Sequence, residues 1–112
     1  MKRKGIGEFE ELVLLAICVL NNNAYSIAIK AEVEKRMNRS FNVSAIQTTL
    51  YRMEDKGLVE SSLGESNSLR GGKRKRIFNV TAFGLTSLSQ IKETRNSLWN
   101  DIPEVVLKTI NN

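Results

Sequence analysis

The sequence predicts a mainly α-helical fold with one small β-hairpin, and three observations support this prediction. Apolar residues recur at helical spacing in three segments before residue 57 and in one long segment after residue 81. Between them, two short runs with strand-like patterning flank a polar, glycine-containing stretch, which is typical of a hairpin. The chain has 112 residues, 41% of them hydrophobic, so we expect a single domain with a packed core.

The first predicted helix spans residues 8–21 and is apolar around nearly its whole circumference. Leu12 and its helical neighbours mark one face, and Leu15 and Cys18 lie on the opposite one. Such a helix must be covered on both sides, and in so small a protein we expect the second cover to be another subunit. Cys18 is the single cysteine, so no intramolecular disulfide can form, and we expect it to be buried and unreactive.

Two more helices follow, over about residues 25–37 and 44–56. Ser44 and Gln47 have the spacing of a capping box, which predicts that the third helix begins at Ser44. Gly57 is well placed to end this helix in a left-handed conformation.

The hairpin and the C-terminal helices complete the pattern. Strands are predicted over residues 58–63 and 76–80, and Thr81 can cap a long helix that reaches about residue 99. Pro103 interrupts the pattern, and a short helix over residues 104–110 can follow. The order of three helices, a hairpin and a long helix is typical of a winged helix-turn-helix, a fold that reads DNA.

Catalysis is disfavoured by the residues that are missing. The chain has no histidine, which is the commonest general base at neutral pH, and its one cysteine lies in an apolar run. No cluster of His, Cys and carboxylates has the spacing of metal ligands. Gly5 and Gly7 follow no strand, so they are not a phosphate-binding loop. We therefore expect no enzyme activity, no metal and no cofactor.

The charge favours a nucleic-acid partner. The formal net charge is +5, and residues 64–80 contain five basic side chains and one acid. Two sets of residues are predicted to contact duplex DNA. The third helix would place polar side chains in the major groove, namely Ser44, Gln47, Thr48, Tyr51 and Arg52. The basic tip of the hairpin would bind phosphates through Arg70, Lys73 and Arg74, although charge runs of this kind are often only solvated.

The long fourth helix is predicted to pair with its copy in a homodimer. Its apolar stripe consists of Leu85, Leu88, Ile91 and Leu98. Trp99, near the end of the helix, either packs in the core or dimer interface, or forms one wall of a cavity at the dimer interface for a small planar or cationic effector.

Two blocks of the sequence resemble the PadR family of bacterial regulators, in its short form. SAIQTTLYRMEDKGLV, Ser44–Val59, is similar to the family's recognition helix, and RGGKRKRIFNVTAFGLTSL, Arg70–Leu88, to its wing and the start of its dimerisation helix. The resemblance implies a winged helix-turn-helix, dimerisation through the C-terminal helix, and repression relieved by a small molecule. This chain has Gln47 where the family usually has an aromatic residue, and Pro103 shortens or kinks the last helix.

We therefore expect residues 1–80 to form a winged helix-turn-helix DNA-binding domain and residues 81–112 a dimerisation helix and tail, together one compact unit. The predicted function is a transcriptional repressor that binds operator DNA. A protein-interaction module that keeps the fold without DNA specificity is the alternative. No hydrophobic run approaches the roughly 18 residues of a membrane span, so we expect a cytoplasmic location and no membrane contact.

Overall fold

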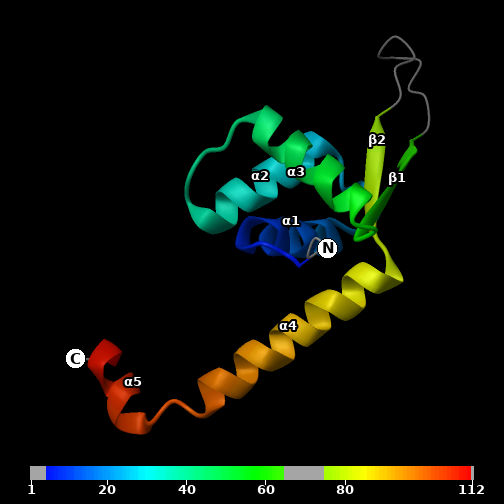
Figure 1. Ribbon diagram of the computed structural model, residues 1–112. Coiled ribbons are helices and arrows are strands. Elements are labelled where there is room, and N and C mark those ends of the chain that lie inside the picture. The colour runs from blue at the N-terminus through cyan, green and yellow to red at the C-terminus, as the bar shows by residue number, and fades with distance from the viewer. Residues whose placement is uncertain (1–4, 65–74, 112) are drawn as a thin grey trace.

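The computed structural model describes residues 5–64 and 75–111, and its helices and strands follow one another in the predicted order (Figure 1). The elements are α1 (Glu8–Leu20), the short 3-10 helix η1 (Asn21–Asn23), α2 (Ser26–Met37), α3 (Val43–Asp55), β1 (Val59–Leu63), β2 (Arg76–Val80), α4 (Ala82–Asn100) and α5 (Glu104–Asn111). The helical pair α2–α3 and the hairpin after it form a winged helix-turn-helix, so the predicted fold class is confirmed. Within the described ranges, no helix has the length and apolar character that a membrane crossing requires.

The hairpin is attached to the start of α2 as well as to the end of α3. β1 and β2 pair in antiparallel fashion, with Val59 opposite Val80 and Leu63 opposite Arg76. On the other edge of β2, the Phe78 N–H donates to the Ala24 carbonyl at 3.0 Å. Because this bond holds β2 beside the entry to α2, the wing has a fixed position relative to the helical pair.

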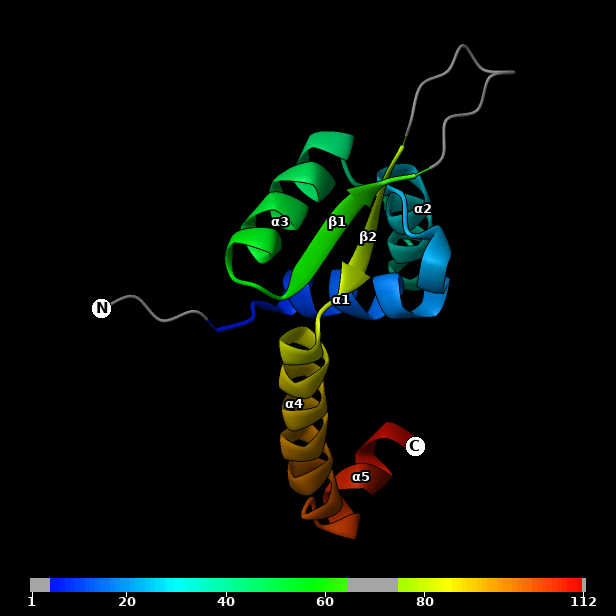
Figure 2. The same cartoon turned by 90° about the vertical axis from the view of Figure 1, so that its right-hand side faces the viewer.

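One continuous core joins the first three helices to the hairpin. Leu14 of α1, Ile29 of α2, Ile46 of α3 and Phe78 of β2 are all buried in it. Figure 2 shows α1 lying across the base of this assembly, beneath α3 and the hairpin. We call residues 5–64 and 75–80 the body.

The remaining helices, α4 and α5, form an arm that points away from the body (Figures 1 and 2). The arm begins at Thr81, whose hydroxyl accepts a hydrogen bond from the Gly84 N–H at 3.0 Å, as the predicted cap requires. A Cβ at Gly84 would clash with the Leu58 carbonyl oxygen, so glycine allows α4 to approach the hairpin closely. The Cα radius of gyration is 17.1 Å, whereas a compact chain of this length has about 13 Å. The arm therefore makes the single chain elongated.

Candidate nucleic-acid interface

The outer side of α3 carries the polar residues that the sequence predicted for DNA contact. The exposed side chains on this face are Ser44, Gln47, Thr48, Tyr51 and Arg52. The opposite side of the helix packs into the core through Ile46, Leu50 and Met53, which are buried. The structure thus brings this predicted set together on one surface, and the rest of the described chain leaves that surface uncovered.

The two ends of α3 compare differently with the prediction. At the C-terminal end, Gly57 has φ 77°, and the Leu58 N–H donates to the Met53 carbonyl at 2.9 Å, so the predicted left-handed cap is confirmed. At the N-terminal end, the predicted capping box at Ser44 was wrong. The cap position belongs to Asn42, whose carbonyl accepts from the Ile46 N–H at 3.3 Å. Because the helix already begins at Val43, Ser44 lies in its first turn and faces outward.

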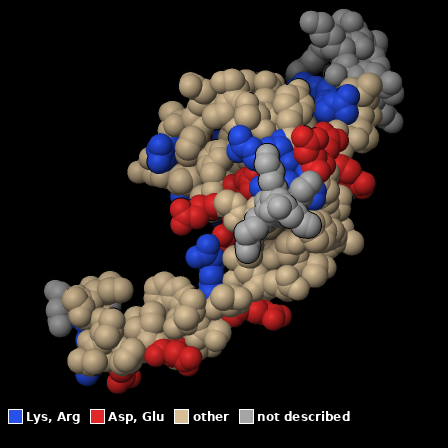
Figure 3. Space-filling model, in the orientation of Figure 1, with Lys and Arg blue, Asp and Glu red and all other residues tan. Residues whose placement is uncertain are grey.

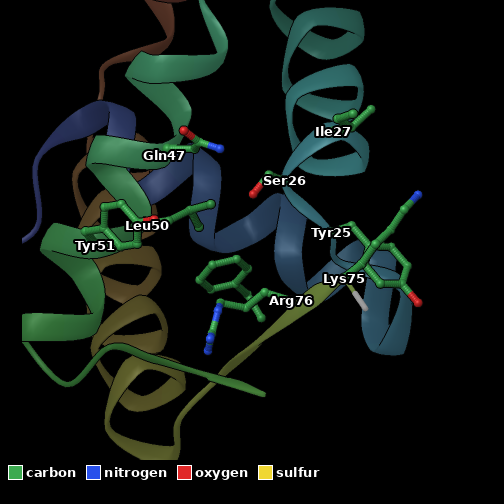
Figure 4. Close-up of a pocket in the computed structure, with 9 residues that line it drawn as sticks. Tyr25, Ser26, Ile27, Gln47, Leu50, Tyr51, Lys75 and Arg76 are labelled. Atoms are coloured by element: carbon green, nitrogen blue, oxygen red, sulfur yellow. The ribbon is translucent and has the colours of Figure 1, made fainter. Parts of the chain in front are cut away.

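A hollow of about 290 Å³ lies between α3, the first turn of α2 and the start of β2 (Figure 4). From α3 it is lined by Gln47 and Tyr51, and from α2 by Ser26 and Ile27. Figure 4 shows Gln47 directed from α3 toward the space in front of Ser26. Sequence reasoning missed the α2 side of this hollow, because residues 25–27 form no charged or polar motif and reach α3 only through the tertiary fold.

Two basic residues at the start of β2 stand beside this hollow. Lys75 Nζ lies 5.4 Å from the centre of the Tyr25 ring, and Arg76 Nη1 donates to Ser61 Oγ at 3.0 Å. The Ser61 hydroxyl in turn donates to a Glu54 carboxylate oxygen at 2.7 Å. These contacts hold the two cations on the hairpin, where Figure 3 shows Lys and Arg atoms gathered at the end farthest from α4. The charge run in the sequence indicated a basic wing but not these partners.

A partly buried ion pair fixes the C-terminal end of α3 to the start of α1. Lys56 Nζ lies 2.8 Å and 3.0 Å from the two carboxylate oxygens of Glu10, and it also donates to the Gly5 carbonyl at 2.8 Å. Burial raises the pKa of Glu10, but hydrogen bonds from Lys56 and from the Gly7 N–H outweigh it, so the pKa lies below its ordinary value. No pattern in the sequence indicated this pair, because its members are 46 positions apart.

The predicted phosphate-binding residues Arg70, Lys73 and Arg74 lie outside the described residues. Their neighbour Lys75 is exposed. Within residues 5–64 and 75–111, no group of three or more His, Cys, Asp or Glu side chains could hold a metal ion.

The four residues of the predicted dimer stripe do not share one environment. Leu85 and Leu98 are exposed, and Ile91 is half-buried. Leu88 is only 6% exposed, because it packs into the core of its own chain against α1. Farther along the arm, apolar residues of α5 are exposed as well, and they are Val105, Val106 and Ile110.

A groove of about 540 Å³ runs between α1 and α4, and Trp99 lies at one end of it. Trp99 is exposed, so its packing in the core of the single chain is ruled out. Cys18 also lines the groove and is exposed, so the predicted burial of this cysteine was wrong. The reason is that the body covers only one side of α1. The groove walls still desolvate the thiol in part, which raises the pKa of Cys18.

Several solved structures have this fold at low sequence identity. A PadR-like transcriptional regulator from Bacillus cereus has a TM-score of 0.67 and 20% identity, over 93% of this chain and 92% of that one. A PadR family regulator from Eggerthella lenta has a TM-score of 0.64 and 20% identity, over 88% and 86%. RosR from H. salinarum has a TM-score of 0.66 and 22% identity, over 94% and 89%. At these identities the likeness establishes the fold.

The sequence comparison identifies the family. A search of curated proteins found no match to the chain. The model of the transcriptional regulator PadR-like family, in contrast, matches residues 14–90, from within α1 to the first half of α4. Members of this family are transcriptional regulators and not enzymes, which confirms the prediction about catalysis. The chain therefore belongs to the PadR-like family of transcriptional regulators.

Proposed function

We propose that this protein is a repressor that binds a specific operator in duplex DNA as a homodimer, with α3 in the major groove. The observation that carries the proposal is the outer face of α3, where Ser44, Gln47, Thr48 and Arg52 are exposed on one side of a helix whose other side is anchored in the core. The major groove admits one α-helix, and the first turns of that helix approach the base edges.

Phosphate contacts from α3 and from the hairpin beside it would supply much of the affinity. Arg52 on α3 and Lys75 and Arg76 at the start of β2 are exposed cations beside the polar face. By sequence, Arg70, Lys73 and Arg74 extend this basic run. Each phosphate neutralised releases condensed counterions, which makes binding tighter at low salt.

The arm is the proposed dimerisation element, so residues 1–80 bind DNA and residues 81–112 hold two subunits together. Its support is the exposed apolar surface of the arm, above all Leu85, Leu98 and α5. Leu12 and Leu15 add to it, because both lie on the uncovered side of α1 and not on opposite faces as the sequence predicted. Leu88 is buried in the core of its own chain, so it would hold α4 in place beneath this surface. Exposed apolar patches that continue from one element to the next are typical of protein interfaces.

An effector that relieves repression would bind in the groove between α1 and α4, next to Trp99. The charged residues that line this groove are Lys92, Arg95 and Glu11, and Glu11 already pairs with Arg95 at 2.8 Å. The excess of positive charge favours a planar ligand that is neutral or anionic over a cationic one. The chain has a single tryptophan, so its fluorescence reports on this site alone. Saturable quenching of that fluorescence by a planar neutral or anionic dye, together with weaker DNA binding in the presence of the dye, would support the site. Quenching that leaves DNA affinity unchanged would contradict it.

DNA binding is tested by fluorescence anisotropy with a duplex selected from a random library, at several salt concentrations. The triple variant Arg52→Ala, Lys75→Ala, Arg76→Ala should bind more weakly and flatten the plot of log K against log salt by up to about 0.9 per lost phosphate contact. Lys35→Ala is the matched control for each of the three single variants, because it removes one exposed cation from the end of α2 that lies away from the hairpin. A dimeric, folded protein that enriches no duplex would favour the protein-interaction module instead.

Repression itself is tested in cells. A reporter promoter that overlaps the selected duplex should lose activity when the protein is present and keep it with the triple variant. Unchanged or increased expression would leave DNA binding intact and overturn the repressor assignment.

A further inference from the structure

The first two turns of α3 present no charged side chain to DNA. Residues 43–49 are all uncharged, and the first cation on the helix is Arg52, in its third turn. In the loop before α3, Arg39 is held over the Phe41 ring at 5.0 Å. The commonest specific contact in the major groove, a bidentate arginine or lysine on guanine, therefore has no donor in these two turns.

Gln47 is the residue in these turns that is best suited to read a base. Its side chain is exposed, and within the described chain its amide makes no hydrogen bond. A free carboxamide offers one donor and one acceptor side by side. These groups match the N7 acceptor and the N6 amino donor of adenine, whereas guanine presents two acceptors at the same edge.

Exposed aliphatic side chains flank Gln47 on a face that is otherwise polar. Ile27, in the first turn of α2, is 70% exposed and lines the same hollow as Gln47 (Figure 4). Val43, the first residue of α3, is 43% exposed. The thymine methyl group is the one apolar feature that base pairs display in the major groove. A glutamine with one aliphatic side chain a turn earlier on α3 and another across the hollow on α2 therefore suits A·T pairs.

We infer that this surface reads A·T pairs at the centre of each half-site, with Gln47 on an adenine and with Ile27 and Val43 against thymine methyl groups. The inference rests on the proposed DNA-binding function and adds the identity of the bases. A G·C pair at this position would place guanine O6 against the amide carbonyl of Gln47, and cytosine would offer no methyl group to Ile27.

The test uses base analogues in a duplex selected from a random library by the full-length protein. Replacing the central adenine with 7-deazaadenine removes only the N7 acceptor and should weaken wild-type binding by about 5- to 100-fold. The variant Gln47→Ala should bind both duplexes equally. Replacing thymine with deoxyuridine removes only the methyl group and should cost the wild type about fourfold per site, and this loss should disappear in the double variant Ile27→Ala, Val43→Ala. The same replacements in the flanks of the duplex serve as controls.

A gain-of-function variant guards against misreading a general loss of binding. Gln47→Arg should shift the selected pair at the centre of each half-site from A·T to G·C, because arginine donates to guanine O6 and N7. Both side chains are exposed, so melting curves of the Gln47 and Ile27 variants should match the wild type. Selection of central G·C pairs by the wild type, or equal losses on 7-deazaadenine for wild type and Gln47→Ala, would overturn the inference while DNA binding stands. If no duplex is enriched at all, the proposed function itself fails.

Discussion

The body and the arm of this protein handle their apolar residues in opposite ways. In the body, the large aliphatic residues Leu14, Ile29 and Leu50 are buried, and one core links the helices to the hairpin. In the arm, Leu88 joins that core, whereas Leu98 and Ile110 stay exposed. The body can therefore be stable as a single chain, whereas the arm exposes apolar surface that the proposed dimer would cover.

Replacing a core residue of the body should have the largest effect. Leu50 is 1% exposed and anchors α3 from below, so Leu50→Ala should lower the free energy of unfolding by about 2–5 kcal/mol. Chemical denaturation measures this change. Leu98→Ala removes the same atoms from the exposed part of the arm and should change the stability of the monomer little. Equal losses for the two variants at a protein concentration where the chain is monomeric would show that the arm is packed within its own chain.

A substitution at the joint between body and arm should be the next in size. The Gly84→Ala methyl group would press on the Leu58 carbonyl and on a Val80 methyl group, so the start of α4 has to shift, at a cost of about 1–3 kcal/mol. Gly7→Ala is the control, because a Cβ there meets only a Glu10 oxygen at 3.7 Å. Thermal melts that show no difference between the two variants would contradict the tight joint.

The ion pair between Glu10 and Lys56 should contribute less, and its contribution should depend on pH. Glu10→Gln should cost about 1–2 kcal/mol at neutral pH, because it weakens a charge-assisted hydrogen bond that is mostly buried. The pKa of Glu10 is lowered in the folded protein, so this stabilisation is complete above the unfolded pKa of about 4.3 and is lost as the pH falls through the lower folded pKa. Denaturation at a series of pH values should show the wild type and Glu10→Gln converging in acid.

Glu60→Gln is the matched control for that series. Glu60 is exposed on β1 and forms no ion pair within the described chain, but its replacement changes the net charge equally. A pH-independent difference between wild type and Glu10→Gln would show that the loss comes from packing rather than from the charge.

The sequence predicted the fold where local chemistry decides it. Gly57 and Thr81 mark the ends of their helices as expected, because a left-handed cap and a hydroxyl cap depend on the residue itself. The capping box at Ser44 failed because Asn42, two residues earlier, has the extended backbone of a cap. Competing caps so close together cannot be ranked from spacing alone.

Features that depend on tertiary neighbours could be predicted only in part. The polar face of α3 followed from helical periodicity, whereas Ile27 and Tyr25 reach the same hollow from another helix and gave no signal. Periodicity placed Leu88 and Leu98 on one stripe of α4, but it does not say that the first meets α1 and the second does not. Cys18 was assigned to the core because its neighbours are apolar, and the missing information was which side of α1 the body covers.

A substitution at the far end of the arm should affect the single chain least. It tests most directly whether the arm, unlike the body, leaves its apolar residues without a partner in the monomer. Ile110 is 75% exposed, so Ile110→Ser should change the stability of the monomer by no more than about 0.5 kcal/mol. If α5 belongs to the interface, the same substitution should weaken the dimer, and sedimentation velocity over a concentration series should show dissociation at higher protein concentration than for the wild type. Thr109→Ser, at the adjacent exposed position, is the control and should leave the dimer intact. A normal dimer in both variants would confine the interface to α1 and α4, because Ile110 would then have no partner in the monomer or in the dimer. A destabilised monomer would contradict the contrast between body and arm, since it would mean that Ile110 is already packed within its own chain.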